Sequence, residues 1–151
     1  MAVMIGDEAP LFSLPDQDGK MFDLGSMIGK KVMVVYFYPK DETPGCTKEA
    51  CYFRDRYEDF VSLGADVVGI SSDPQRSHQE FATKHNLPFR ILSDVDEKVR
   101  EMYGATGLLG PGRVTYVIDK KGVVRHIFSS QMQATKHIDE AFAMVEKLAK
   151  G

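Results

Sequence analysis

Residues 32–51 read VMVVYFYPKDETPGCTKEAC, an apolar run followed by a turn and the start of a helix. The unbroken apolar run Val32–Tyr38 is typical of a central strand that is buried on both faces of a sheet. Pro39 ends this strand because proline has no N–H group to give to a sheet. A helix is expected to follow over Thr43–Leu63, with its first residue as N-cap and Pro44 at the first helical position.

The two cysteines of the chain, Cys46 and Cys51, both fall in this expected helix. Cys46 would lie in the first turn, where free backbone N–H groups and the positive end of the helix dipole favour a thiolate. The step from Cys46 to Cys51 gives about 7.5 Å of rise and about 140° of rotation, so their Cα atoms would lie roughly 8–9 Å apart. A disulfide needs Cα atoms within about 7 Å, so the helix must unwind before the two sulfur atoms can bond.

The remaining chain alternates strands and helices, which predicts one α/β domain over residues 1–151. Ser72, Asp73 and Pro74 are expected to cap a helix that runs to His85. Asp119–Gly122 has the composition of a hairpin turn. Other strands are expected over 65–71, 89–93, 114–119 and 123–129, other helices over 96–103 and 135–150, short extended pieces over 10–24, and a loop over 104–112.

A βαβ unit followed by a hairpin and a C-terminal helix is the element order of a thioredoxin-like fold, in which helices flank a central mixed sheet. In open α/β sheets, functional sites gather at the carboxyl ends of the strands. Cys46 follows the carboxyl end of the Val32–Tyr38 strand, so its place in the sequence agrees with that rule.

Composition limits the class of protein further. The net charge of −3 over 151 residues argues against a nucleic-acid partner. No apolar stretch approaches about 18 residues, so no membrane span is expected. The N-terminus lacks the parts of a signal peptide, and any transit peptide would be absent or already removed. Two cysteines in a chain of this size do not make a secreted disulfide scaffold.

The run Pro39-x-x-x-Thr43-x-x-Cys46 resembles the active-site motif of the peroxiredoxins. Gly45–Cys51 resembles their Q branch, also called bacterioferritin comigratory proteins. The loop Leu108–Arg113 is more similar to plastid and cyanobacterial members than to common bacterial ones. The resemblance covers nearly the whole chain and includes the segments Gly6–Phe12, Gly69–Asp73 and Gly112–Asp119 and the C-terminal helix.

This resemblance implies a role for each residue of the motif. Cys46 is expected to be the peroxidatic thiol and Cys51 the resolving thiol, which together form an intramolecular disulfide. Thr43 and Arg113 are expected to activate the reaction, and Pro39 to shield the pocket from solvent. The family reduces hydrogen peroxide and organic hydroperoxides in antioxidant defence, with thioredoxin as electron donor. It needs no metal, haem, flavin or other cofactor.

The chemistry of the reaction independently favours residues of these types. Lowering the pKa of a thiol raises its ionised fraction but also lowers its nucleophilicity, so the net gain is only a few-fold. Efficient O–O cleavage therefore needs a fixed cation, a hydroxyl and N–H donors aimed at the peroxide oxygens. Thr43 and Arg113 are suitable, although only the resemblance selects Arg113, which is far from Cys46 in the sequence.

Each of these residues also has a purely structural interpretation. Cys46 and Cys51 would be small buried side chains, Thr43 only an N-cap, Pro39 only a strand terminator and Arg113 a surface residue. Glu49 is as compatible with an ordinary helix-surface charge as with a place in the site. The histidines show no ligand spacing with the cysteines, and a structural role is expected for His78, His85, His126 and His137.

Two other classes of function compete with a peroxidase. Thioredoxin-like disulfide reductases and isomerases use Cys-x-x-Cys, whereas the spacing here is longer. A redox-sensing or metal-binding module is disfavoured because two thiolates without nearby histidine ligands make a poor zinc site. We expect a monomer, since the disulfide would stay within one chain, and a cytoplasmic protein, with a mature chloroplast protein as the alternative.

Overall fold

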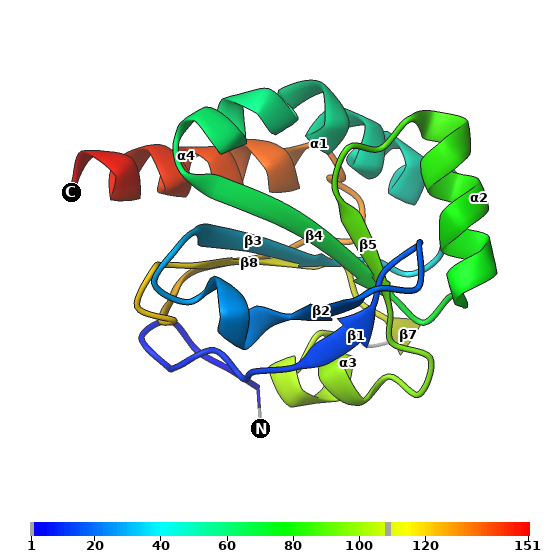
Figure 1. The fold of residues 1–151 in the computed structure, drawn as a ribbon, viewed down its shortest axis with the longest axis horizontal. Coiled ribbons are helices and arrows are strands. Elements are labelled where there is room, and N and C mark those ends of the chain that lie inside the picture. The colour runs from blue at the N-terminus through cyan, green and yellow to red at the C-terminus, as the bar shows by residue number, and fades with distance from the viewer. Residues whose placement is uncertain (1, 108–109) are drawn as a thin grey trace.

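The computed structural model describes residues 2–107 and 110–151. Its centre is a five-stranded mixed sheet in the order β5-β4-β3-β8-β9 (Figure 1). The first three of these strands are mutually parallel, and β8 runs antiparallel to both of its neighbours. The strands are β3 (Val32–Phe37), β4 (Ala65–Ser71), β5 (Arg90–Ser93), β8 (Val114–Ile118) and β9 (Val124–Ser129).

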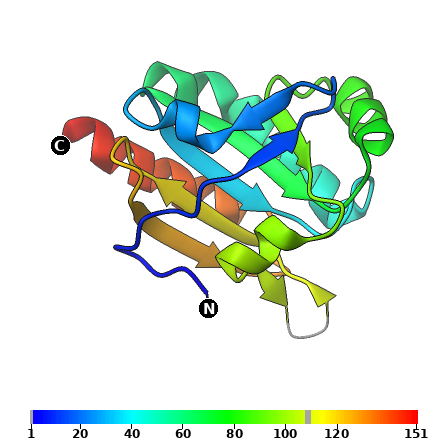
Figure 2. The ribbon, with the colours of Figure 1, turned by 60° about the horizontal axis from the view of Figure 1, so that its bottom comes forward.

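Helices cover one face of this sheet, and smaller elements cover the other. Figure 1 shows α1 (Pro44–Ser62) and α4 (Lys136–Lys150) side by side above the sheet, with α2 (Gln75–His85) beside β5. Figure 2 brings forward the opposite face, which carries the N-terminal hairpin and α3 (Lys98–Tyr103). The hairpin consists of β1 (Ser13–Pro15) and β2 (Met21–Asp23), and the 3-10 helix η1 (Leu24–Met27) follows it.

Alternating side chains of β3 enter the two hydrophobic clusters that lie on either side of the sheet. Val34, Tyr36 and, just after the strand, Tyr38 pack with α1, α2 and α4. Met33, Val35 and Phe37 pack with the N-terminal segment and α3. Every residue of β3 is buried, which confirms the expected central strand and the thioredoxin-like α/β fold.

Most predicted boundaries agree with the structure to within one residue, but three predictions were wrong. Helix α2 begins only at Gln75, and no side chain caps it. Asp73 instead accepts hydrogen bonds from the Asp41 N–H group and the Ser71 hydroxyl. The short helix α3 begins at Lys98 rather than at residue 96.

The third difference is in the segment predicted as a loop over residues 104–112. It contains a small two-stranded sheet, formed by β6 (Thr106–Gly107) and β7 (Gly110–Pro111). Two-residue strands leave no periodic pattern in a sequence. Leu108 and Leu109, on which the similarity to plastid members partly depends, lie outside the described residues.

The hairpin β8–β9 forms where the composition predicted it. Gly122 takes a positive φ of 84°, and its N–H group donates to the Asp119 carbonyl at 3.0 Å. Within the described part of the chain, no helix has the length and apolar character needed to cross a membrane.

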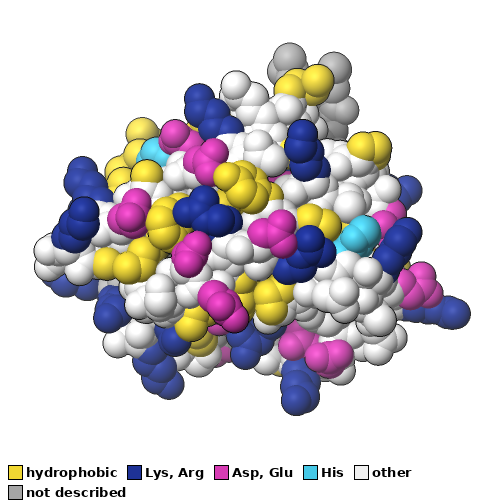
Figure 3. All heavy atoms as spheres, turned by 90° about the horizontal axis from the view of Figure 1, so that it is seen from above, with side chains coloured by type: hydrophobic (Ala, Val, Ile, Leu, Met, Phe, Trp, Pro, Cys, Tyr) yellow, Lys and Arg dark blue, Asp and Glu magenta, His cyan; other side chains and the backbone are white. Residues whose placement is uncertain are grey.

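The outer face of α1 and α4 carries charges of both signs. Figure 3 shows basic, acidic and hydrophobic side chains interspersed over this face. Arg56 links the two helices, since its guanidinium lies 3.3 Å from Asp59 and 3.8 Å from Asp139. The net charge is therefore not concentrated on this side of the molecule.

Candidate active site

Cys46 is the third residue of α1. Thr43 occupies the N-cap position, Pro44 begins the helix, and the Thr47 N–H group donates to the Thr43 carbonyl at 2.9 Å. This confirms the predicted start of the helix. The Cys46 side chain is only 1% exposed, so its sulfur lies inside the protein at the positive end of the helix dipole.

The sheet register brings Arg113 to this helix end. Phe37, the last residue of β3, pairs with Val114, the first residue of the antiparallel strand β8. Arg113 therefore lies beside the carboxyl end of β3, where the chain turns into α1. Its Nη2 donates to the Cys46 Sγ at 3.5 Å, so residues 67 positions apart in the sequence are in contact.

Several further contacts fix the Arg113 guanidinium. Its Nη1 donates to Oε1 of Glu49 at 2.7 Å, and its Nε donates to the Gln131 carbonyl at 3.2 Å. The Arg113 backbone N–H group donates to the Gln131 side-chain oxygen at 2.8 Å. The interpretation of Arg113 as a surface residue is wrong, since it is only 5% exposed.

The absence of a side chain at Gly45 makes room for this guanidinium. A Cβ atom added at Gly45 would lie 2.9 Å from Nη2 of Arg113, closer than Cβ atoms normally approach another heavy atom. Glycine before the cysteine therefore has a steric function at this helix end, because it lets the cation reach the sulfur.

Glu49 is not an ordinary surface charge, because its side chain is fully buried one helical turn after Cys46. Burial raises the pKa of Glu49 to about 8, against the opposing effect of the Arg113 guanidinium. Burial alone would lower the pKa of Arg113, but Glu49 and Cys46 outweigh it and raise that pKa. The Glu49 carboxyl group and the Arg113 guanidinium therefore form a buried contact, which holds the Arg113 side chain against α1.

His137 lies on the far side of Glu49 as a neutral ring. Its Nε2 donates to the Ser130 carbonyl at 2.7 Å, so Nδ1 is free to accept from the Thr115 hydroxyl at 2.8 Å. Burial lowers the pKa of His137 to about 4, and the positive charge of Arg113 acts in the same direction. The 3.7 Å approach of Nδ1 to Oε2 of Glu49 is therefore not an ion pair at neutral pH.

Thr43 and Pro39 flank the cysteine, but neither is hydrogen-bonded to it in the described structure. Thr43 is the N-cap residue, as predicted, but its hydroxyl donates to the Lys40 carbonyl at 2.9 Å and makes no capping bond to the helix. Pro39 lies two residues after the end of β3 and is half-buried. Both residues lie on the turn between β3 and α1, on the approach to Cys46.

Arg100 was not identified from the sequence. Its buried guanidinium donates to the carbonyls of Tyr38 at 2.6 Å, Ala105 at 2.8 Å and Gly112 at 2.7 Å. Burial lowers its pKa. Arg100 ties the end of β3 to the residue before Arg113, so it braces both segments that form the site. A single arginine in a short helix gives no sequence signal for this role.

A second buried network braces the turn that leads to α1. Asp41 accepts from the Tyr38 hydroxyl at 2.6 Å and from Ser77 at 2.8 Å, and it lies 2.7 Å from Nδ1 of His78. Asp41, Asp73 and His78 have the ligand types of a metal site within 4.8 Å of one another. Their polar atoms already bond each other or nearby protein groups, which accounts for the cluster as a structural one.

Cys51 lies on a different side of α1 from Cys46. Its Sγ is 3.8 Å from Nδ1 of His85 at the end of α2, whereas Cys46 faces Arg113. Both cysteines are free, and the helix between them is continuous. This agrees with the expectation that the folded helix keeps the two sulfur atoms apart.

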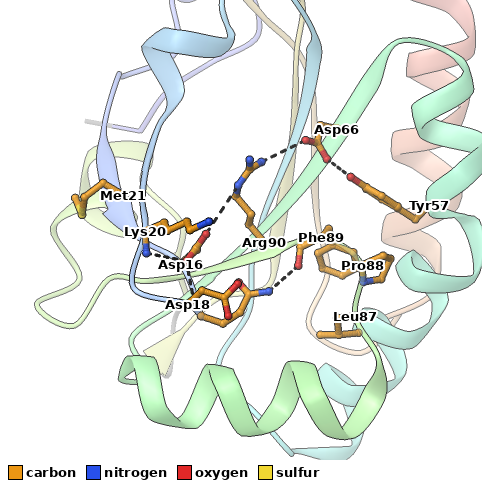
Figure 4. A pocket seen from close by; sticks show the side chains of 11 residues that line it. Asp16, Asp18, Lys20, Met21, Tyr57, Asp66, Leu87, Pro88, Phe89 and Arg90 are labelled. Carbon is orange, nitrogen blue, oxygen red and sulfur yellow. Dashed lines mark hydrogen bonds and ion pairs between the residues drawn. The ribbon is translucent and has the colours of Figure 1, made fainter.

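A polar cavity of about 580 Å³ lies elsewhere, between the N-terminal hairpin, α1 and β5 (Figure 4). Asp66 accepts from the Tyr57 hydroxyl at 2.6 Å and lies 3.5 Å from Arg90. Arg90 also lies 4.0 Å from Asp16. Arg90 thus pairs with two of the acidic side chains that line this cavity, and neither cysteine contributes to its lining.

Comparisons with known proteins agree with this geometry. Residues 5–127 match the family model described as "AhpC/TSA family". "Peroxiredoxin Q, chloroplastic" of Populus jackii is 55% identical over 146 residues, which are 95% of this chain and 68% of the relative.

Two solved structures are similar over almost their whole length. Peroxidoxin BcpB from Mycobacterium tuberculosis has a TM-score of 0.89 and 39% identity, with 95% of this chain and 97% of that chain covered. The bacterioferritin comigratory protein of Xanthomonas campestris, described for its alkyl peroxide reduction activity, has a TM-score of 0.88 and 28% identity, with 99% of each chain covered. The chain therefore belongs to the AhpC/TSA family and lies within its peroxiredoxin Q branch.

Proposed function

We propose that Cys46 is the peroxidatic cysteine of this protein and Cys51 its resolving cysteine. As a peroxiredoxin, the protein is a thiol peroxidase, an oxidoreductase that consumes peroxides and a thiol reductant. The observation that carries the assignment is the 3.5 Å contact between the Arg113 guanidinium and the Cys46 sulfur in the first turn of a helix. A cation and a helix N-terminus at one sulfur favour the thiolate, which is the nucleophilic form.

In the first step, the Cys46 thiolate attacks the distal oxygen of ROOH. An S–O bond forms as the O–O bond breaks, the alkoxide takes up a proton and leaves as ROH, and Cys46 becomes a sulfenic acid. Negative charge develops on the departing oxygen in the transition state. Arg113 supplies fixed N–H donors there, and fixed donors stabilise such charge without first having to reorient.

Glu49 contributes to this step through Arg113. Its buried carboxyl group anchors one end of the guanidinium at 2.7 Å, so that Nη2 stays directed at the sulfur. We assign the Thr43 hydroxyl as a second donor to the peroxide and Pro39 as a shield of the pocket. Their position on the turn before α1 and the peroxiredoxin motif support these two roles.

In the second step, the first turns of α1 unwind and Cys51 condenses with the sulfenic acid. A disulfide forms between Cys46 and Cys51, and water is released. Thioredoxin or a similar dithiol protein then reduces this disulfide. Since the disulfide stays within one chain, the cycle needs no second subunit, and we propose that the protein acts as a monomer.

The substrates we propose are hydrogen peroxide and organic hydroperoxides. The alkyl peroxide reduction activity given for the Xanthomonas campestris relative supports the organic class. The names of the plant relatives support a chloroplast location, the alternative that the sequence left open. A cytoplasmic location has no comparable support.

Stopped-flow mixing of the reduced protein with hydrogen peroxide and with cumene hydroperoxide tests this proposal. We expect fast consumption of one equivalent of peroxide and loss of two hydrogens, localised by mass spectrometry to a Cys46–Cys51 disulfide. Reaction as slow as that of a free thiol would reject the assignment. Full turnover of Cys51→Ser with thioredoxin would reject the resolving role.

A further inference from the structure

The second cysteine has a polar environment of its own, formed by the end of α2 and the turn before α1. The Cys51 Sγ lies 3.8 Å from Nδ1 of His85, the last residue of α2. The other ring nitrogen, Nε2, lies 3.0 Å from Oε1 of Glu42. A thiol, an imidazole and a carboxylate are thus joined in a row.

The partners of the ring determine where its proton lies. The Glu42 carboxylate can only accept a hydrogen bond, so Nε2 of His85 carries the proton that it donates. In the neutral ring, Nδ1 is then an acceptor that faces the Cys51 thiol. This tautomer can take the thiol proton, and the carboxylate stabilises the imidazolium that results.

Neighbouring side chains hold this arrangement in place. Arg54 donates to the His85 carbonyl at 2.7 Å, and the Phe81 ring packs edge-on against the imidazole at 5.0 Å. Lys84 lies 3.6 Å from the second carboxylate oxygen of Glu42. Glu42 has a φ of 63°, in the left-handed region that residues other than glycine seldom adopt. Such a conformation persists where the surroundings fix it, often at functional sites.

Charged groups of both signs surround the thiol. Arg54 lies nearly one helical turn after Cys51 and interacts electrostatically with it. The charged groups that face the Cys51–His85 pair are Arg54 from α1, Lys84 from α2 and Glu42 from the preceding turn. The His85 side chain is 17% exposed, so a proton that it accepts can pass on to solvent.

We propose that His85 is the general base that deprotonates Cys51 in the resolving step, with Glu42 as its positioning residue. This inference rests on the proposed roles of the two cysteines. The Cys51 proton passes to Nδ1 of His85. The Cys51 thiolate then attacks the sulfur of the Cys46 sulfenic acid, so that an S–S bond forms and the S–O bond breaks. The departing hydroxide takes up a proton and leaves as water, while His85 returns its proton to solvent.

Alkylation of Cys51 in a Cys46→Ser protein tests the assignment without any peroxide chemistry. Cys51 is then the only thiol, and its rate of reaction with iodoacetamide follows its thiolate fraction from pH 5.5 to pH 10. We expect His85→Asn in this background to lower the rate about tenfold at pH 7, a smaller effect than the roughly 10²–10⁴-fold of general acid–base catalysis at a reacting centre. The difference in alkylation rate between the two proteins should disappear above pH ~9.5, where a free thiol is mostly ionised without a base.

Two outcomes of this experiment would overturn the proposal. Identical pH profiles with and without His85 would show that the ring does not act on the thiol. A rate lowered equally at every pH would show that it controls only access or structure. Glu42→Gln should give a shift in the same direction but smaller than that of His85→Asn, because it weakens only the positioning of the ring.

His126 provides a matched control. It makes the same kind of contact, with Nε2 2.9 Å from Oε1 of Glu140, but pairs β9 with α4 and has no cysteine partner. His126→Asn in the Cys46→Ser background should leave the alkylation profile of Cys51 unchanged. If it shifted that profile as His85→Asn does, the effect would be a general one and the assignment would be overturned.

The full cycle supplies an independent measurement. With both cysteines present, His85→Asn should leave the first peroxide attack unchanged and slow disulfide formation about tenfold at pH 7. Faster disulfide formation would mean that His85 holds the helix closed, and would overturn the role of base. Absence of peroxide consumption in the parent protein would reject the proposed peroxidase assignment and leave the alkylation result standing.

Discussion

Nη1 of Arg113 lies 2.7 Å from Oε1 of Glu49, and both side chains are buried. Removing one partner of such a pair leaves an uncompensated group in the interior, so a buried pair tolerates truncation poorly. The same guanidinium contacts the Cys46 sulfur through its other nitrogen. The geometry of the reactive sulfur therefore depends on a carboxyl group that does not touch it.

Glu49→Gln should change the way in which the stability of the protein depends on pH. Because the pKa of Glu49 is raised to about 8, the folded state binds this proton more tightly than the unfolded state. The free energy of unfolding should therefore fall as pH rises from about 4.5 to about 8. Urea denaturation at pH 5 and pH 8 should show this loss in the parent protein and a smaller one in Glu49→Gln. An equal loss of stability in both proteins would show that groups other than Glu49 cause it.

Gly45→Ala should separate stability from reactivity. Alanine is a better helix former than glycine by about 0.5–1 kcal/mol in a helix interior, and Gly45 does not have a positive φ, so the backbone itself accepts the substitution. The new Cβ would lie 2.9 Å from Nη2 of Arg113 and displace the guanidinium from the sulfur. We expect peroxide consumption to slow about tenfold by stopped flow. Lys48→Ala, at an exposed position of the same helix, should react at the parent rate.

Arg113→Lys should retain the positive charge but lose the planar guanidinium, whose two terminal nitrogens contact Glu49 and Cys46 at the same time. We expect the rate constant for peroxide attack to fall about 10²-fold, the usual effect of losing a donor that stabilises transition-state charge. Alkylation of Cys46 by iodoacetamide needs no such donor and should fall much less. Equal losses in the two reactions would mean that Arg113 acts only on the ionisation of the thiol.

His137→Gln should alter the acid side of the stability curve. The pKa of His137 is lowered to about 4, so the unfolded state binds this proton more readily than the folded state. The parent protein should therefore lose stability as pH falls from about 6.5 to about 4. Urea denaturation at pH 7 and pH 4.5 measures this loss, which should be smaller in His137→Gln. A parallel loss in the variant would contradict the assignment to His137.

Local sequence predicted the elements that local interactions determine. The apolar strand before Pro39, the helix start at Pro44 and the turn at Asp119–Gly122 each depend on residues close together in the chain. The two cysteines could be placed in the helix from its rise and rotation alone. The thioredoxin-like fold followed from the order of these elements.

Residues whose role depends on burial or register could not be predicted from their neighbours. Arg113 reaches Cys46 only because β8 pairs antiparallel with β3, so the family motif was the sole guide to it. Glu49 and Arg100 have ordinary positions in amphipathic helices, and only tertiary packing buries them. Thr43 is the predicted N-cap residue, but its hydroxyl donates to the Lys40 carbonyl rather than to the helix N–H groups, and the sequence does not show which of these partners it takes.

The position of the two cysteines on different sides of α1 also predicts where the helix must open. Disulfide formation should expose the backbone amides of residues 43–53, while the second half of α1 stays anchored through the buried side chain of Phe60 against the core. Hydrogen exchange measured by mass spectrometry should show faster exchange in the first segment of the oxidised protein and unchanged exchange near Phe60. Cys51→Ser treated with peroxide provides the control, since it is oxidised at Cys46 without forming the disulfide. Equal protection of residues 43–53 in the reduced and disulfide forms would contradict the unwinding step, because a continuous helix keeps the two Cα atoms beyond the reach of a disulfide.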